Sequence, residues 1–184
     1  MNHDMSLTTR SSQFKALVDH CLATDKFGAI VELEHAIVAL CHRLVELRNA
    51  NQSLYIVGNG GSAGVAGHSA TDFFNVAKIR ASTLHESSLL TCMANDFGYE
   101  NAFARMLSQM VKPGDIVIVI SSSGKSVNIR NAAIQGAKNG GFVVTLSGFA
   151  SDNPLRTLGD MNIWLDSNEY GFVEIGHQLS LIHI

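Results

Sequence analysis

The chain has 184 residues, of which 46% are hydrophobic and only 16% are charged. This length and composition predict a single domain, residues 1–184, with a sizeable core, and they exclude a disordered or fibrous chain. The formal net charge of −3 leaves no general basic field for a phosphate backbone, so we expect no direct binding of nucleic acid.

The sequence carries no signal for export or for a membrane. Charged residues interrupt the N-terminal segment, and nowhere do about 18 apolar residues stand together. The cysteines, Cys21, Cys41 and Cys92, are odd in number and lack the spacing of a metal site. We therefore expect a cytoplasmic protein with reduced thiols and no membrane partner.

Two helices are predicted before the first strand, over residues 11–23 and 27–49. The second helix has a seam whose steps alternate between three and four residues, the spacing of a helix that packs against a partner helix. The seam consists of Ile30, Leu33, Ile37, Leu40, Leu44 and Leu47, and a second stripe consists of Val31, Val38 and Val45. We expect residues 1–50 to form a helical interface between subunits; the alternative is that both stripes pack within one subunit.

Short apolar runs alternate with helical segments over residues 51–184. The predicted strands cover residues 54–57, 80–84, 116–120, 142–146 and 162–165. Runs such as IVIVI are apolar throughout, which is typical of strands covered on both faces and linked by helical crossovers. The predicted fold class is α/β, a three-layer α/β/α sandwich of flavodoxin type with a five-stranded parallel sheet.

Two loops at the carboxyl ends of predicted strands are suited to a ligand. Gly58-Asn59-Gly60-Gly61-Ser62 lets the backbone approach a ligand and adds the side-chain donors of Asn59 and Ser62. With the following alanine it also fits G-x-G-x-x-A, which leaves a nucleotide-binding oxidoreductase as an alternative. That alternative lacks the acidic residue expected at the end of the second strand, and it does not explain the other loop.

The other loop is Ser121-Ser122-Ser123-Gly124-Lys125-Ser126, which follows IVIVI and precedes a helix. Several hydroxyls and a helix start would converge there, an arrangement that suits the oxygens of a phosphate monoester. The alternative is an ordinary capped helix start, which needs only one serine. The sequence therefore predicts an anion-binding loop.

These two loops and the segment NDFGYE at residues 95–100 together resemble the phosphoheptose isomerase (sedoheptulose 7-phosphate isomerase) family of sugar isomerase (SIS) proteins. The resemblance implies a homotetramer held by N-terminal helices, with active sites at subunit interfaces. It also implies that the serine loop holds the phosphate and that the other motifs contact the sugar chain. The substrate-binding residues implied are Asn59, Gly60, Ser62, Asp96, Ser121, Ser122, Ser123 and Ser126.

Interconversion of a ketose and an aldose needs a base, an acid and a group that stabilises an oxyanion. His68 and Asp72 lie one helical turn apart, and the resemblance implies a zinc half-site there, although the family usually has Glu in place of Asp72. A second helix offers Glu174. The histidine that the family places eight residues later is replaced by Ile182.

His177, three residues after Glu174, could serve in place of the missing histidine, whereas His183 would face about 180° away from Glu174 on an ideal helix. We predict catalytic roles for Asp72, Glu174 and His177. The predicted zinc ligands are His68, Asp72, Glu174 and His177.

The sequence thus predicts a sugar-phosphate aldose-ketose isomerase acting on sedoheptulose 7-phosphate. The alternative is a non-catalytic SIS protein that binds sugar phosphate and acts through a protein partner, as the DnaA initiator-associating protein of the same family does. The departures at Asp72 and Ile182 favour that alternative. Stoichiometric zinc together with turnover would distinguish the enzyme.

Overall fold

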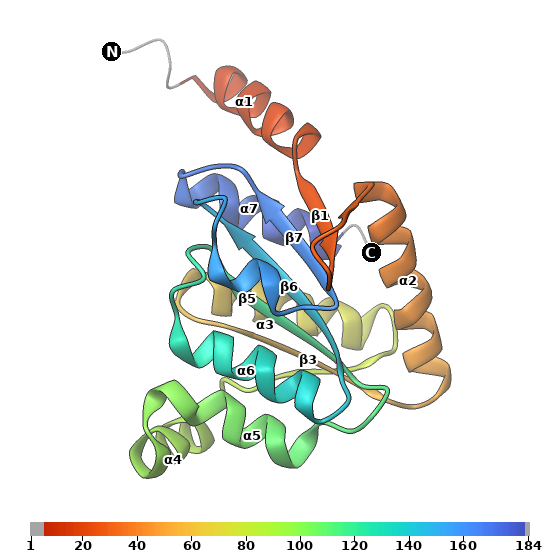
Figure 1. The fold of residues 1–184 in the computed structure, drawn as a ribbon, viewed down its shortest axis with the longest axis vertical. Helices are drawn as coiled ribbons and strands as arrows, with labels where there is room; N and C mark the ends of the chain where they lie inside the picture. Colours follow the sequence, from red (N-terminus) through yellow and green to blue (C-terminus); the bar gives the residue numbers. More distant parts are fainter. Residues whose placement is uncertain (1–5, 183–184) are drawn as a thin grey trace.

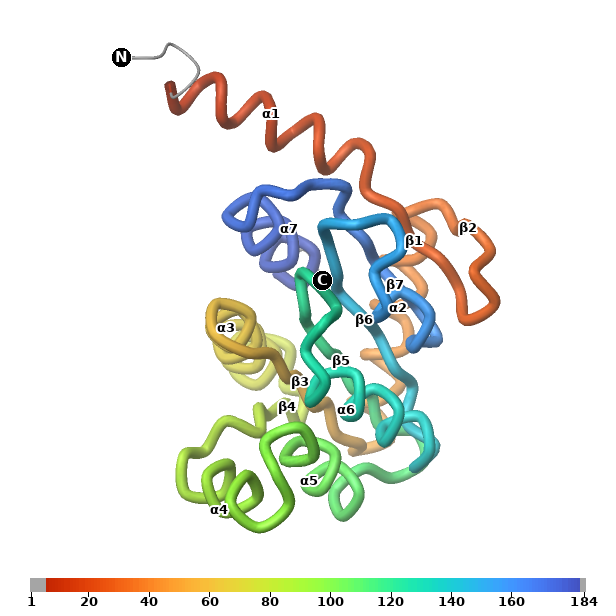
Figure 2. The backbone as a smooth tube through the Cα atoms, turned by 60° about the vertical axis from the view of Figure 1, so that its left-hand side comes forward, coloured from red at the N-terminus to blue at the C-terminus, as the bar shows by residue number. Residues whose placement is uncertain are grey.

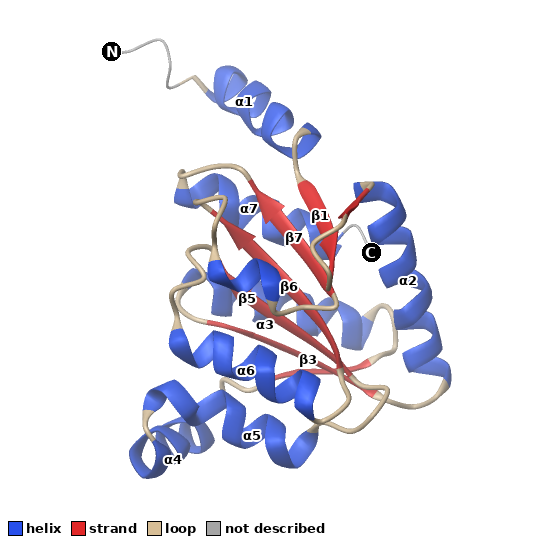
Figure 3. Cartoon of the chain, viewed as in Figure 1, coloured by secondary structure: helices blue, strands red, loops and turns tan. Residues whose placement is uncertain are grey.

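The computed structural model of the chain describes residues 6–182 and contains a seven-stranded sheet between layers of helices (Figure 1, Figure 3). The strands are β1 (Leu22–Asp25), β2 (Ile30–Val31), β3 (Ser53–Gly58), β4 (Arg80–Thr83), β5 (Ile116–Ser121), β6 (Phe142–Gly148) and β7 (Met161–Leu165). The helices are α1 (Leu7–Asp19), α2 (Leu33–Asn49), α3 (Gly61–Asn75), α4 (Ser87–Phe97), α5 (Ala102–Met110), α6 (Val127–Lys138) and α7 (Tyr170–Ile182), with 3-10 turns η2 (Tyr99–Asn101) and η3 (Pro154–Thr157). Among the described residues, no helix combines the length and apolar character needed to cross a membrane.

Five of the strands are parallel and stand in the order β4-β3-β5-β6-β7. They are the five strands that the apolar runs predict, so this part of the prediction is confirmed. The chain moves from β3 to β4 and then returns to β5 on the other side of β3, so its direction reverses between β3 and β5. Ligands of open parallel sheets bind at such a reversal, beyond the carboxyl ends of the strands.

Different helices cover the two faces of the sheet, and the sandwich has the three layers predicted. In β5, Ile116, Ile118 and Ile120 pack with residues of α2, α3 and α7, whereas Val117 and Val119 pack with α5 and α6. Alternate side chains of a strand point to opposite faces, which explains why the run is apolar throughout. At about 25 cal/mol per Å² of buried apolar area, these two clusters supply most of the stabilisation.

The sheet is larger than predicted, and it is mixed. The prediction of a purely parallel, five-stranded sheet is wrong because residues 22–25 and 30–31 form β1 and β2, although residues 22–23 and 30–31 were expected within helices. Strand β1 runs antiparallel to β7, and β2 pairs with β1 at the edge. Asp25 closes the turn between them, because its Oδ1 accepts hydrogen bonds from the amides of Phe27 (2.8 Å) and Ala29 (2.9 Å). A turn held by an aspartate side chain is an alternative to helix for these residues. The apolar periodicity of the segment favoured the helix, so the turn was not predicted.

Helix α2 begins later than predicted and buries only one of its two stripes. Glu32 caps it by accepting hydrogen bonds from the amides of two residues in its first turn. Leu40 and Leu44 of the seam lie in the core of the same chain, whereas Val38 and Val45 are 51% and 44% exposed. The second stripe is therefore the part of the helix that is free to contact another subunit.

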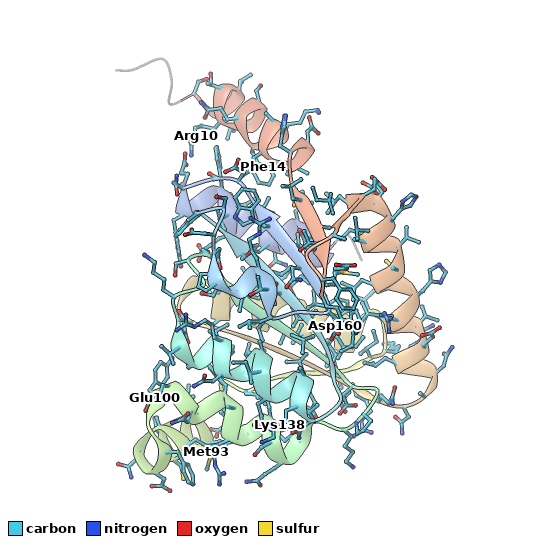
Figure 4. All side chains as sticks on the ribbon, viewed as in Figure 1. Arg10, Phe14, Met93, Glu100, Lys138 and Asp160 are labelled. Carbon is cyan, nitrogen blue, oxygen red and sulfur yellow. The ribbon has the colours of Figure 1, made fainter. Side chains whose placement is uncertain are left out.

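Helix α1 lies outside the three layers and contacts the start of α7. Arg10 forms an ion pair with Glu169 and stacks on the ring of Phe172, with its guanidinium carbon 4.0 Å from the ring centroid. The rings of Phe14 and Phe172 lie 5.8 Å apart. Figure 4 shows Arg10 and Phe14 on the side of α1 that faces the rest of the chain.

Candidate functional site

A pocket of about 290 Å³ lies where the chain direction reverses, beyond β3 and β5. Seven of the eight predicted substrate-binding residues line it, namely Asn59, Gly60, Ser62, Ser121, Ser122, Ser123 and Ser126. The remaining lining comes from Ile120, Phe149 and Tyr170, of which Phe149 and Tyr170 follow later strands and carried no local motif. Two loops that are distant in sequence thus form one site.

The serine loop, residues 121–126, presents free hydroxyl groups to the pocket. Ser122 is 5% exposed, and its Oγ has no hydrogen-bond partner among the described residues. Ser126 stands at the N-cap of α6, yet its side chain makes no capping bond within residues 6–182. A buried polar group left unpaired costs about 1–3 kcal/mol, so these hydroxyls suit a ligand that accepts hydrogen bonds. The start of α6 adds the positive end of the helix dipole.

The shape of the serine loop depends on Gly124 and Asn153. Gly124 has φ of +64°, and a Cβ there would overlap the side chain of Asn153. Asn153 is 3% exposed, and its Nδ2 donates to the carbonyl oxygens of Ser122 and Gly148, each at 2.8 Å. The sequence analysis missed Asn153 because it lies after β6 and belongs to no local motif. It joins the serine loop to β6 and thereby fixes the position of the serines.

The loop after β3 is held by His85, which follows β4. Its Nε2 lies 2.9 Å from the carbonyl oxygen of Gly58, and because a carbonyl can only accept, Nε2 carries the hydrogen. Burial lowers the pKa of His85 despite this bond, so the ring is neutral near pH 7. The ring also meets Phe103 edge-on, with centroids 5.5 Å apart. His85 therefore supports the ligand loop.

Asn59 takes part in a network of side chains beside the pocket. Its Nδ2 donates to Asn128 Oδ1, and Asn128 Nδ2 donates back to Asn59 Oδ1, both at 2.9 Å. The Tyr99 hydroxyl donates to the same Asn59 oxygen at 2.9 Å. Tyr99 belongs to the predicted NDFGYE motif, but the sequence analysis did not identify Asn128, which lies in the first turn of α6.

Asp96 does not line the pocket of its own chain. It lies exposed near the end of α4, and its carboxylate accepts hydrogen bonds from Asn95 Nδ2 (2.9 Å) and the Cys92 thiol (3.7 Å). Helix α4 has no buried residue and sits at the edge of the molecule (Figure 1). The role predicted for Asp96 at the substrate therefore stays a prediction.

His68 and Asp72 lie on one face of α3, as their spacing predicts. Asp72 Oδ2 is 3.2 Å from His68 Nε2, and their side chains are 46% and 64% exposed. Asp72 lines a separate, mostly apolar cavity of about 410 Å³ together with Leu181 and Ile182. Neither His68 nor Asp72 lines the pocket that the serine loop lines. His183 lies outside the described residues.

Helices α3 and α7 lie side by side (Figure 2). Glu174 of α7 reaches the start of α3 at Gly61. Its carboxylate fills the space that a Cβ at Gly61 would occupy, and its Oε1 is buried without a partner among the described residues. Tyr170, one turn earlier on α7, lines the pocket. The Glu174 carboxylate, chiefly by accepting a hydrogen bond, raises the pKa of Tyr170, so this phenol stays protonated.

His177 is fully buried and points toward the sheet. Its Nε2 lies 3.0 Å from the carbonyl oxygen of Ser147 in β6 and must donate to it, while its Nδ1 has no partner in the described part of the chain. Burial lowers the pKa of His177 to about 4, so the ring is neutral at pH 7. No group of three or more His, Cys, Asp or Glu in residues 6–182 could hold a metal ion. The four predicted zinc ligands do not form a site within one chain.

Known proteins with similar sequences belong to one family of sugar isomerase domains. Residues 22–148 match the family model described as the SIS domain. A phosphoheptose isomerase from Trichlorobacter lovleyi is 32% identical over 176 residues, which cover 92% of this chain and 88% of the relative. A second, from Roseiflexus sp., is 34% identical over 80% of this chain and 77% of its own length. The chain belongs to the phosphoheptose isomerase family of SIS proteins.

Solved structures of this family share the fold. A phosphoheptose isomerase from Neisseria gonorrhoeae superposes with a TM-score of 0.81 over 96% of this chain and 92% of its own, at 21% identity. One from Francisella tularensis gives 0.80 over 96% and 91%, at 20% identity. The family resemblance inferred from the motifs is confirmed, and so is the three-layer α/β architecture.

Proposed function

We propose that this member of the phosphoheptose isomerase family converts sedoheptulose 7-phosphate into heptose 7-phosphate. The observation that carries the proposal is the pocket between the serine loop and the β3–α3 loop, in a chain whose curated relatives are named phosphoheptose isomerases. We expect the protein to act in the cytoplasm as a homotetramer.

The serine loop binds the phosphate group. Ser122 and Ser126 line the pocket with hydroxyls that make no hydrogen bond within the described residues, and α6 begins directly after Ser126. A hydrogen bond to a charged group is worth about 1.5–3 kcal/mol, so two such hydroxyls and a helix start can anchor a phosphate monoester. The sugar chain then extends toward Asn59 and Tyr170.

The chemistry moves one proton from C1 to C2 of the ketose and a second from O1 to O2, so no external oxidant or reductant is needed. We assign the carbon proton to Glu174, whose buried Oε1 has no partner and which lies against the start of α3. Tyr170 stays protonated beside it and lines the pocket, so it can donate a hydrogen bond to the substrate there. The oxyanion of the enediolate is stabilised by the amides at the start of α3.

The described residues of one chain do not form a zinc site, and the proposed reaction does not use zinc. A structural or catalytic zinc takes three or four protein ligands, whereas His68 and Asp72 supply two and His177 is turned into the core. A metal would need further groups from another subunit. In the homotetramer that we propose, the exposed side chains of His68 on α3 and Asp96 on α4 are free to face another subunit.

The burial of His177 supports a second candidate function, the non-catalytic sugar-phosphate-binding protein that acts through a protein partner. With His177 in the core and Ile182 in place of a histidine, the described part of α7 brings no imidazole to the pocket. Such a protein would bind the ligand as well as the enzyme does but leave it unchanged.

Incubation of the purified protein with sedoheptulose 7-phosphate, with and without added zinc, tests both candidates. Proton NMR of the sugar would show the aldose accumulate if the isomerase proposal holds. Binding by calorimetry without any turnover, in either condition, would support the second candidate. Absence of both binding and turnover would refute both.

A further inference from the structure

The carbonyl oxygen of the Asn59 side chain is already fully used. An amide oxygen has two lone pairs, and here one accepts from Asn128 Nδ2 and the other from the Tyr99 hydroxyl, both at 2.9 Å. The Asn59 Nδ2 has two hydrogens, of which one is given to Asn128 Oδ1. The second hydrogen is the one bond that this side chain can still offer a ligand.

The orientation of the Asn59 amide is fixed from the main chain of α6. Asn128 Oδ1 also accepts a hydrogen bond from the backbone amide of Ile129 at 3.0 Å, which an amide nitrogen in that place could not do. The Ile129 amide is shared with the Ser126 carbonyl oxygen at 3.2 Å, and its shorter bond to Asn128 favours the orientation that places the Asn128 oxygen toward Ile129. Because Asn128 is 4% exposed and pairs reciprocally with Asn59, its orientation sets that of Asn59.

We propose that Asn128 and Tyr99 are positioning residues that hold the Asn59 amide so that it can only donate to the sugar. The inference rests on the proposed function, because it concerns how that pocket reads the sugar chain. It follows that the position facing Asn59 selects an oxygen that accepts a hydrogen bond, such as the carbonyl oxygen of the open ketose. A group that only donates a hydrogen bond would therefore not be accepted beside Asn59.

Asn128→Asp tests the orientation with almost no change of shape. The carboxylate keeps an acceptor for Ile129 and for Asn59 but removes the donor to Asn59 Oδ1. In either orientation of Asn59, its Nδ2 then donates to one carboxylate oxygen and its Oδ1 is repelled by the other. The variant therefore no longer favours the orientation in which Asn59 Nδ2 donates toward the pocket. Tyr99→Phe removes only one of the two bonds to Asn59 Oδ1 and leaves the pairing with Asn128 intact.

Affinity for sedoheptulose 7-phosphate should fall about tenfold in Asn128→Asp and about threefold in Tyr99→Phe, as expected for loss of one directed hydrogen bond. Gln135→Glu is the matched control, because it adds the same charge to α6 and also breaks an amide–amide bond, to Asn139 (2.6 Å), away from the pocket. It should bind within about twofold of wild type. Equal affinity in wild type and Asn128→Asp, measured by calorimetry, would overturn the inference.

A second measurement needs no ligand and therefore separates this inference from the proposed function. In ¹⁵N NMR of the free protein, the side-chain amide of Asn59 should show one hydrogen protected from exchange and one that exchanges freely. Asn128→Asp should give the Asn59 amide a second or exchange-broadened set of signals, because both orientations become populated, while Gln135→Glu keeps the single wild-type set. An unprotected Asn59 amide in the wild type would refute the positioning role, whereas a normal spectrum without ligand binding would refute only the proposed function.

Discussion

The serine loop and helix α7 both contribute to the same cleft, but their residues reach it in different ways. In the serine loop, Ser121, Ser122, Ser123 and Ser126 all line the pocket, directly after a buried strand. On α7, Tyr170 lines the pocket, Glu174 lies behind it against Gly61, and His177 is buried under β6. Within about two turns α7 thus passes from Tyr170, which lines the pocket, to His177, which no ligand in the pocket can reach.

This difference has a physical cause. A loop at the end of a parallel strand lies on the ligand side because of topology alone, whatever its side chains are. The depth of a residue on a helix depends instead on how the helix is rotated against its neighbours. The small residues Gly61 of α3 and Gly176 of α7 let α7 lie close to α3 and to β7, and this close packing leaves His177 in the core.

The largest effect is expected in the serine loop. Replacing Ser122 and Ser126 together by Ala should weaken the binding of sedoheptulose 7-phosphate at least about a hundredfold, because two hydrogen bonds to a charged group are lost. Ser87→Ala with Ser88→Ala, at the start of α4 outside the pocket, is the matched control. Calorimetry measures both; a serine-loop variant that binds as the control does would mean that the phosphate lies elsewhere.

The same distinction explains which parts could be predicted from the sequence. The five parallel strands and the serine loop are encoded by contiguous runs, so their positions follow from local pattern and topology. Strand β1 was missed because it forms only by pairing with β7, far along the chain. The clamp by Asn153 and the inward rotation of His177 depend on packing between distant elements, which spacing along one helix does not reveal.

Stability should depend on pH through His177. Its pKa is lowered to about 4, below the ordinary value of about 6.5, so between these values the unfolded chain binds the proton and the folded chain does not. The free energy of unfolding is therefore undiminished above pH 6.5 and falls by up to about 3 kcal/mol as the pH drops toward 4. Burial lowers the pKa of His85 as well, which adds a loss of the same sign.

Urea denaturation at several pH values measures this slope. His177→Gln provides the comparison, since its amide can still donate to the Ser147 carbonyl but cannot take up a proton. The variant should lose most of the pH dependence below pH 6.5. If wild type and variant share the same slope, His177 is not the buried, neutral group that distinguishes α7 from the serine loop.

Gly61→Ala should impair the catalytic group on α7 without affecting the serine loop. The added methyl group would overlap the Glu174 carboxylate and displace it, so kcat should fall at least about tenfold while phosphate affinity changes little. Gly64→Ala on the same helix is the control, because nothing lies within 4 Å of a Cβ there. A Gly61 variant with normal kcat would show that Glu174 does not move the proton.

The smallest effect on the stability of one chain is expected for changes on the exposed face of α2, which we propose contacts a second subunit. Charges at Leu40 or Leu44 would unfold the chain, because both are buried in its own core, whereas Val38 and Val45 are about half exposed. Replacing Val38 and Val45 by Glu should change the free energy of unfolding of one chain by about 0.5 kcal/mol or less. Light scattering should nevertheless show that the oligomer splits.

In the dissociated protein, phosphate binding and turnover should respond differently. The serine loop is complete within one chain, so phosphate binding should survive dissociation, whereas under our proposal the exposed Asp96 and His68 act in catalysis only together with another subunit. Turnover should therefore be lost while affinity for sedoheptulose 7-phosphate stays within about threefold of wild type, since every bond to the phosphate is retained. A dissociated variant that still isomerises the sugar would show that one chain holds the whole active site, and a wild type that is already monomeric would refute the interface on α2.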